Sequence, residues 1–140
     1  MKMFISVFLL LASVGALAGR AEAQVIVIAN QSVKSDAVSK NDLREVFLGN
    51  STNLKDGSRV KPVLLKEGAI HAEFLSNVMG KSPTGFMVAW RGVVMSGQST
   101  MPKAFDSETA MVDYVSHTAG AVGYIGKATP HGGVKVIDVH

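Results

Sequence analysis

Short apolar runs alternate along the chain with apolar stripes at helical spacing. Residues 25–29, VIVIA, form an unbroken β-branched and apolar run, which is typical of a strand covered on both faces and predicts the centre of a sheet. Leu43, Val46 and Phe47 then recur at helical spacing and predict a helix that ends at Gly49. The chain is therefore expected to pass from a buried strand into a helix.

The stretch 59–80 joins a strand to a helix through a glycine turn. Its apolar run, 60–65, precedes Gly68, after which Ile70 and Phe74 begin a helical stripe. In an α/β protein, the carboxyl end of a strand and the free N–H groups of the next helix meet at such a junction, which is a natural place for an anion. This stretch is the first candidate for a binding site.

The remaining pattern predicts two more helices and two closing strands. The stripes predict helices over 83–96 and 108–117, and β-rich runs predict strands over 121–125 and 134–139. Residues expected to cap the helices are Ser82, Ser107 and, for the first helix, either Ser39 or Asn41. This order of elements predicts an α/β fold with a mixed, largely parallel sheet flanked by helices.

The first residues have the pattern of a secretory signal. Lys2 precedes the apolar run 3–17, and an Ala-Glu-Ala cleavage motif follows. We predict a signal peptide over 1–23 and a single domain over 24–140, with a periplasmic or secreted product. Cleavage at 16–18 is an alternative, and a membrane anchor would need a longer apolar span.

Charge and cysteine content narrow the function classes. The formal net charge is +3 at pH 7, there is no cysteine, and the lysines are scattered singly. Nucleic-acid grooves need basic residues clustered with aromatic ones, and disulfides or thiol catalysis need cysteine. We therefore expect no nucleic acid among the partners and, after signal cleavage, no membrane span.

Catalytic and metal-binding motifs are not recognisable. No metal-ligand spacing relates the four histidines, His71, His117, His131 and His140. The chain has neither a nucleophile elbow nor a dinucleotide fingerprint, and methionines on apolar stripes usually fill cores. We therefore predict a protein that is not an enzyme, with no metal site and no cofactor.

An ordered set of short motifs extends over nearly all of residues 24–140. The set is the run 43–49 (LREVFLG), Asp56-Gly57, Pro62-Val63, Phe74, Trp90, Gly97, Met101-Pro102 and the run 120–124 (GAVGY). In this order the motifs resemble the phosphate-binding, type 2 periplasmic binding protein superfamily, in particular its small phosphate ABC transporter substrate-binding protein-like members. The resemblance implies a sheet with helices on both sides, equivalent to one lobe of a two-lobed binding protein.

Two segments carry the candidate ligand-binding residues. At the junction they are Lys66, Gly68, Ala69, Ile70 and His71. After the first strand they are Asn30, Gln31 and Ser32. The junction can offer a cation, backbone amides and an imidazole, and the second segment would lie at the same edge of a parallel sheet. An ordinary strand-to-helix turn and a polar loop are the alternatives.

The family resemblance also bears on the composition of the junction. Phosphate-binding members of the family carry an arginine near the strand end and a Ser-Gly-Thr run at the helix start, and these groups surround phosphate with donors. This chain has Leu64 or Leu65 at the first place and residues 68–71, GAIH, at the second. The backbone amides, Lys66 and His71 are therefore the local argument for an anion.

Two functional hypotheses follow. The first is an exported periplasmic binding protein-like domain whose ligand, as the resemblance implies, is phosphate or another small anion. The second is a protein-interaction or accessory module that has lost solute binding and contacts a partner protein or its own copy. Measurements of anion binding and of oligomeric state distinguish the two.

Overall fold

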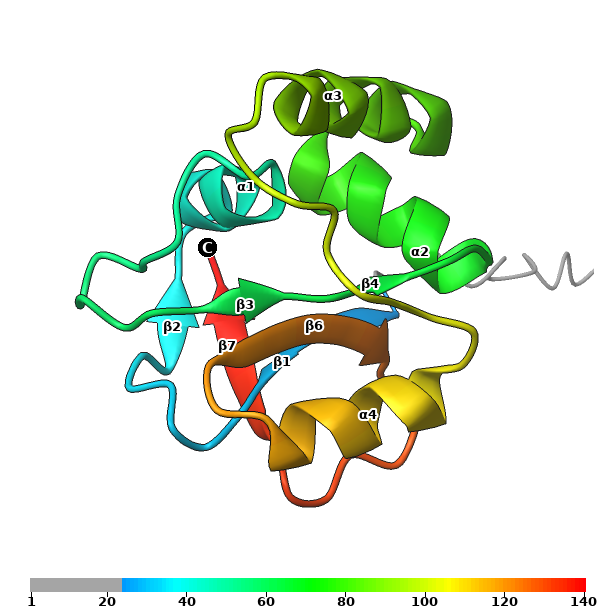
Figure 1. Cartoon of the computed structure of the whole chain (residues 1–140). Helices are drawn as coiled ribbons and strands as arrows, with labels where there is room; N and C mark the ends of the chain where they lie inside the picture. Colours follow the sequence, from blue (N-terminus) through cyan, green and yellow to red (C-terminus); the bar gives the residue numbers. More distant parts are fainter. Residues whose placement is uncertain (1–23) are drawn as a thin grey trace, which may run out of the picture.

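A five-stranded sheet forms the centre of the structure (Figure 1). Its order is β2 (Ala37–Val38), β7 (Lys135–Val139), β1 (Val25–Ala29), β6 (Ala121–Gly126) and β3 (Lys61–Pro62). A separate two-stranded sheet consists of β4 (Leu64–Leu65) and β5 (Ala104–Phe105). The structure, a computed structural model, describes residues 24–140; the predicted signal peptide, 1–23, lies outside the described residues.

The sheet is mixed, as the sequence predicts. β1 runs antiparallel to β6 and β7, whereas β2 with β7, β3 with β6, and β4 with β5 are parallel pairs. β1 lies at the centre with Val27, Ile28 and Ala29 buried, which confirms the central strand predicted from VIVIA. The parallel pairs are short, so the longest ladders are antiparallel.

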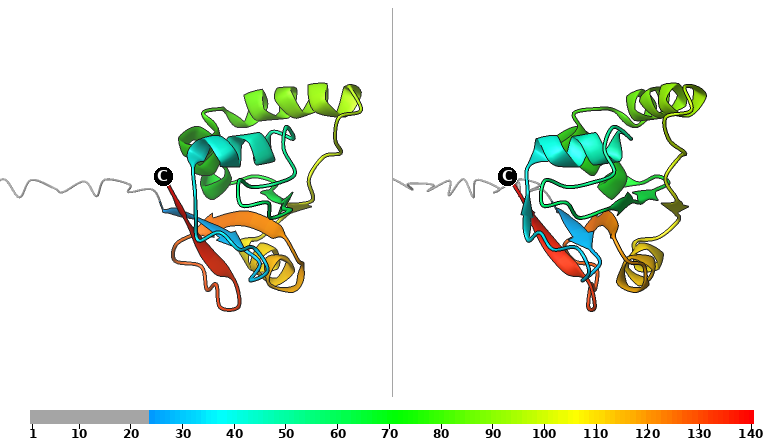
Figure 2. Two further views of the ribbon diagram at one scale, coloured as in Figure 1. Left: turned by 90° about the vertical axis from the view of Figure 1, so that its left-hand side faces the viewer. Right: turned by 60° about the vertical axis from the view of Figure 1, so that its left-hand side comes forward.

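In the described part of the chain, four α-helices flank the sheet, as predicted. They are α1 (Lys40–Phe47), α2 (Ala69–Phe74), α3 (Pro83–Met95) and α4 (Glu108–His117). A π-helical turn over Leu75–Met79 continues α2. Helices α1, α2 and α3 lie on one side of the sheet and α4 lies on the other (Figure 1 and Figure 2). Within residues 24–140, none of the helices has the length and apolar character needed to cross a membrane.

Local signals explain where these helices begin. The hydroxyl oxygens of Ser39, Ser82 and Ser107 each accept a hydrogen bond from a backbone N–H in the first turn, which satisfies a donor that has no intrahelical partner. Ser39, rather than Asn41, caps α1. Capping depends on neighbouring residues alone, so the sequence predicts it well.

Three details differ from the sequence-based expectation. The run 60–65, expected as one strand, is divided at Val63, because β3 joins the main sheet and β4 pairs with β5. β2 and β5 lie in segments for which the pattern predicts no helix or strand, since a two-residue strand has no recognisable period. The helix after Gly68 widens into a π turn at Leu75.

An aromatic cluster connects the sheet to the helices above it. The rings of Phe74 and Tyr124 stack with centroids 3.8 Å apart, and Phe47 meets Phe74 edge-on at 5.0 Å. Trp90 is 2% exposed, and its indole N–H donates to the carbonyl of Phe47 over 2.8 Å. Phe86 and Trp90 are the buried residues of α3, so two aromatic side chains anchor this helix to the core.

Candidate functional site

The predicted junction forms a hollow at the carboxyl end of β4. Gly68 turns the chain from β4 into α2 with a φ of 105°, and no neighbouring atom lies within 4 Å of the place where its Cβ would be. The hollow beside it measures about 660 Å³ and extends to the first turn of α4 and the loop after β6. Gly68, Ala69 and Ile70 all line it.

Carboxylates surround this hollow. Glu67, Asp106 and Glu108 are part of its lining, and the ammonium of Lys66 lies 3.1 Å from a carboxylate oxygen of Asp106. Both partners are largely exposed, so the pair itself is weak. The lining nevertheless includes three carboxylates and no cation, which disfavours an anion, and the cation predicted to attract it already has a counter-ion. These charges argue against phosphate at the junction.

Hydrogen bonds fix the carboxylate of Glu108 beside the hollow. Its carboxylate accepts hydrogen bonds from the backbone N–H of Gly126 and, over 2.8 Å, from the hydroxyl of Thr129. A carboxylate in the first turn of α4 is also stabilised by the helix dipole. The fold therefore holds the negative charge of Glu108 at this hollow.

His71 points into the core, contrary to its predicted role as an exposed anion ligand. The side chain is 8% exposed, and its Nδ1 shares a hydrogen bond with the hydroxyl of Tyr124, whose oxygen accepts the N–H of Leu65 over 3.0 Å. Burial lowers the pKa of His71 and raises the pKa of Tyr124. The imidazole is therefore neutral near pH 7, and it joins α2 to β6 rather than binding an anion.

Asn30, Gln31 and Ser32 lie at the opposite end of the sheet from the junction. β1 runs antiparallel to β6, which is parallel to β3, so the carboxyl end of β1 lies beside the start of β6, where Asn30 N–H donates to Ala121. The expectation that the two candidate segments share one sheet edge is wrong. The antiparallel placement of β1 is the reason.

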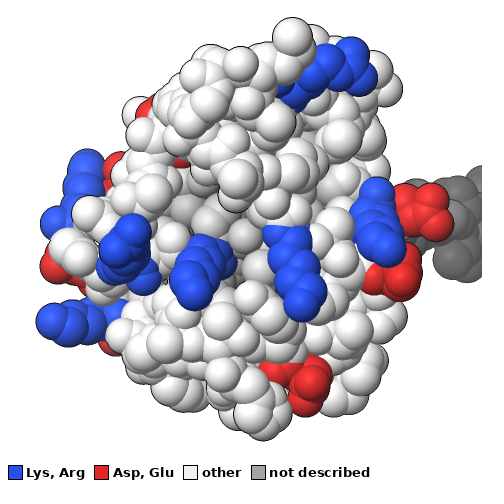
Figure 3. Space-filling model, viewed as in Figure 1, with Lys and Arg blue, Asp and Glu red and all other residues white. Residues whose placement is uncertain are grey.

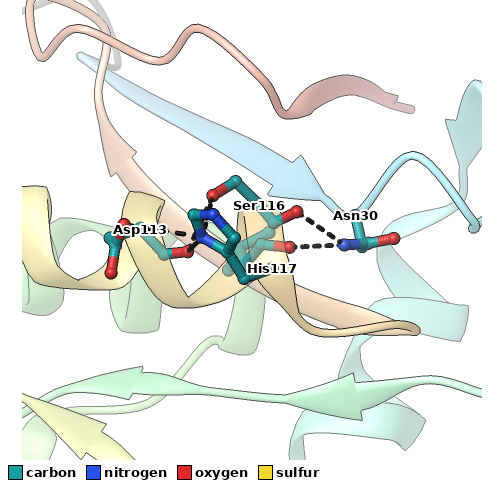
Figure 4. A network of polar contacts seen from close by, with 5 residues as sticks. Asn30, Asp113, Ser116 and His117 are labelled. Atoms are coloured by element: carbon teal, nitrogen blue, oxygen red, sulfur yellow. Dashed lines mark hydrogen bonds and ion pairs between the residues drawn. The ribbon is translucent and has the colours of Figure 1, made fainter.

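Asn30 has a structural role at the end of α4 (Figure 4). Its amide donates to the carbonyl of Val115 over 2.7 Å and of Ser116 over 3.2 Å, and its carbonyl accepts the N–H of Ser32. These bonds satisfy helix carbonyls that have no intrahelical partner. Asn30 therefore fastens the end of β1 to α4, and Gln31 beside it is exposed.

Ser116, His117 and Asp113 form a cluster that has the composition, but not the geometry, of a catalytic triad (Figure 4). The Nδ1 atom of His117 contacts both the hydroxyl of Ser116 at 2.9 Å and the carbonyl of Asp113 at 2.8 Å. A triad needs the two ring nitrogens on different partners. The serine hydroxyl also donates to the Asp113 carbonyl over 2.7 Å. This cluster is a helix end, and within residues 24–140 no three metal-ligating side chains come together.

A second hollow, which we call the Trp90 groove, lies beside β3. It measures about 280 Å³ and runs between the end of α1, β3 and the segment 99–103. The side chains that define it are Val46, Lys61, Val63, Trp90, Lys103 and Tyr114. Its lining contains two lysines and no carboxylate. The sequence gives no sign of this groove, because its residues come from five separate segments and its lysines look like ordinary surface charges.

Comparison with known proteins adds structural relatives. No family model and no curated protein sequence matches the chain. Among solved structures, the chain superposes on an ABC-type phosphate transport receptor from Vibrio cholerae with a TM-score of 0.61 and 19% identity, over 83% of this chain and 46% of the receptor. PstS from Borrelia burgdorferi gives a TM-score of 0.60 and 14% identity, over 84% and 47%. The chain has the fold of one lobe of these binding proteins.

A third structure agrees with this assignment of the fold. A putative phosphate ABC transporter substrate-binding protein from Clostridium perfringens, with phosphate bound, gives a TM-score of 0.63 and 13% identity, over 83% of this chain and 44% of that protein. The chain spans less than half the length of each of these structures. The single binding-protein lobe that the motifs predict is thereby confirmed as a fold, while identities this low say nothing about the ligand.

Proposed function

We propose that this protein is an exported, single-lobe binding protein for a small anion, and that it acts by binding rather than by catalysis. The observation that carries the proposal is the superposition of the lobe on phosphate receptors over 83% of the chain. Because the relative from Clostridium perfringens holds bound phosphate, inorganic phosphate is the first ligand to test.

The charge on one face of the lobe supports an anionic ligand. Basic side chains cross the middle of this face in a row, over β3 and β4 (Figure 3). Among the described residues, neither Lys61 nor Lys103 lies in an ion pair. Unpaired ammonium groups raise the local concentration of anions and steer them to the surface. We therefore propose that the anion binds on this face rather than at the carboxylate-lined junction of Gly68, Ala69 and Ile70.

Binding is tested with the protein purified from the periplasm of cells that express the full sequence. Calorimetry and thermal melting are measured against phosphate, sulfate and a series of small carboxylates at millimolar concentration. We expect at least one anion to release heat and to raise the melting temperature, because a ligand that binds the folded state stabilises it. A protein that responds to none of these anions would rule out the proposed function.

Export is tested with the same preparation. We propose cleavage of residues 1–23, so the intact mass and the first residues of the periplasmic protein should correspond to a chain that begins at Gln24. Recovery of a chain that still carries Met1, or of no protein in the periplasm, would contradict a periplasmic or secreted location.

The second candidate function is a protein-interaction module, and the surface of α3 favours it. Met87, Val88, Val94 and Met95 on this helix are 46 to 81% exposed, which is a large apolar area for a monomer to present to water. Light scattering of the purified protein over a range of concentrations tests self-association. A monomer that recovers no periplasmic protein in pull-downs would exclude this candidate.

A further inference from the structure

We infer that the Trp90 groove binds a small organic anion, a carboxylate with an apolar body, and that Lys61 and Lys103 hold its carboxylate. This inference rests on the proposed function, for which it names the site and the class of ligand. The groove lies beside the edge strand β3. It is separate from the hollow at the end of β4, with which it shares no lining residue.

Both lysines of the groove are unpaired, as are Lys34, Lys40, Lys81 and Lys127 among the described residues; what sets Lys61 and Lys103 apart is that both line one groove. The ammonium groups of Lys55, Lys66 and Lys135 lie 3.8, 3.1 and 2.8 Å from a carboxylate. Lys61 and Lys103 have no carboxylate within ion-pair distance among the described residues. Their charges are therefore available to a ligand, and the absence of acidic groups from the groove lining leaves the local potential positive.

Aromatic rings hold one of these ammonium groups in position. Lys103 Nζ lies 4.8 Å from the ring centroid of Tyr114 and 5.6 Å from that of Phe105. Such cation–π contacts restrict the side chain without neutralising its charge. Tyr114 also lines the groove, so the ammonium stands over the same ring that a ligand entering the groove would meet.

The base of the groove is apolar. Val46, Val63 and Trp90 are each at most 2% exposed and form the part of the lining that belongs to the core. The indole N–H of Trp90 is already bonded to Phe47 and the side chain is 2% exposed, so the small part of the tryptophan that reaches the groove is carbon rather than a donor. A volume of about 280 Å³ is at the small end of ligand pockets. It suits a single ring or a short aliphatic chain.

Hydroxyl groups on both sides of the groove complete its polar rim. Thr52 precedes β3 and Thr100 belongs to the segment that follows α3, and both line the groove. Within residues 24–140, neither threonine hydroxyl is bonded to another protein group, unlike the hydroxyls of Ser51 and Ser99 beside them. They can donate to a carboxylate oxygen that the lysines leave unsatisfied.

This combination favours an organic carboxylate over inorganic phosphate. Phosphate carries polar oxygens on every side, and an apolar base would strip their water without replacing it. The groove also lacks an arginine, the side chain that matches phosphate with two parallel hydrogen bonds. A carboxylate with an apolar body places its charge at the rim and its carbon atoms against the apolar lining, of which Met101 is 38% exposed and Tyr114 half-buried.

The test uses benzoate as the probe and benzamide as its uncharged counterpart. Trp90 is the single tryptophan of the chain and lies in the groove, so its fluorescence reports binding at this place, and calorimetry gives the affinity. We compare the unaltered protein with Lys61→Gln, Lys103→Gln, Lys66→Gln at the junction, and Lys127→Gln as a matched control. All four lysines are exposed, and melting curves verify that each variant folds.

We expect benzoate to change the Trp90 fluorescence and to bind at least about tenfold more tightly than benzamide, a difference of about 1.4 kcal/mol. Lys61→Gln and Lys103→Gln should each weaken benzoate about fivefold, whereas Lys66→Gln and Lys127→Gln should not. Anion binding that is lost in Lys66→Gln but kept in both groove variants would overturn the inference and leave the proposed function intact. Equal affinity for benzoate and benzamide, or no response to benzoate, would also overturn it. A protein that binds none of the tested anions would sink both proposals.

Discussion

Gly49 offers the sharpest test of how α1 packs against α3. The residue follows α1 with a φ of 80°, and a Cβ placed on it would lie 2.8 Å from Cη2 of Trp90 and 3.1 Å from Cγ1 of Val93. Gly49→Ala therefore has two costs. A non-glycine residue in the left-handed region costs about 1–2 kcal/mol, and overpacking against a buried indole costs about 1–3 kcal/mol.

Gly57→Ala is the matched control for this substitution. Gly57 has nearly the same φ, 84°, but nothing lies within 4 Å of the position of its Cβ. It should therefore show the backbone cost alone, whereas Gly49→Ala should lose about 2–5 kcal/mol in all. For a domain of this size, a loss of about 3 kcal/mol corresponds to a melting temperature lower by roughly 10–15 °C.

Urea unfolding followed by far-UV circular dichroism measures both variants. The difference between their losses in free energy of unfolding is the cost of the contact with Trp90. The cost of Gly49→Ala should be smaller in a Trp90→Phe background, because the effects of substitutions at contacting residues are not additive. If Gly49→Ala costs no more than Gly57→Ala, the close packing of α3 on the end of α1 is refuted. The Trp90 groove would then lack its rigid base.

Three further predictions concern the buried polar groups. The folded-state pKa of His71 is below its ordinary 6.5, so below about pH 6.5 the unfolded chain binds more protons than the folded one. The free energy of unfolding should therefore decrease as the pH is lowered. A His71→Gln variant should lose this part of the slope in urea titrations between pH 7 and 5. Tyr124→Phe removes the acceptor of the Leu65 N–H and the hydroxyl bonded to His71, and it should cost about 1–3 kcal/mol, whereas an unchanged unfolding midpoint would contradict the network. Asn30→Ala should cost about 1–3 kcal/mol because helix carbonyls lose buried donors, and Gln31→Ala beside it should change stability by less than about 0.5 kcal/mol; equal effects of the two would show that Asn30 does not fasten α4.

The helices and the central strand were predictable because their signals are local. Ser39, Ser82 and Ser107 cap the helices that follow them, and each helix buries at least two residues of the apolar stripe visible in the sequence. A helix period and a cap involve residues a few positions apart, so they are legible without knowledge of the fold. The same is true of the VIVIA strand, whose continuous apolar run requires cover on both faces.

The candidate site was predicted less well, because a site depends on residues far apart in the chain. Gly68, Ala69 and Ile70 do line a hollow, but Glu108 and Asp106 reach it from another segment and reverse its electrostatic character. Nothing in the residues next to His71 indicates that its side chain is buried, because its hydrogen-bond partner, Tyr124, is more than fifty positions away in the sequence. Long-range pairing decided both outcomes.

By itself, the sequence determined an α/β fold, its helices and its buried central strand, since periodicity, caps and apolar runs act over a few residues. The tertiary structure alone decided that β1 runs antiparallel to its neighbours, which sends Asn30 and the Gly68 turn to opposite ends of the sheet. It also decided that Lys61 and Lys103 border one groove without a counter-ion among the described residues. Strand direction and the charge of a cavity depend on segments far apart in the sequence, so they are set only when the chain folds.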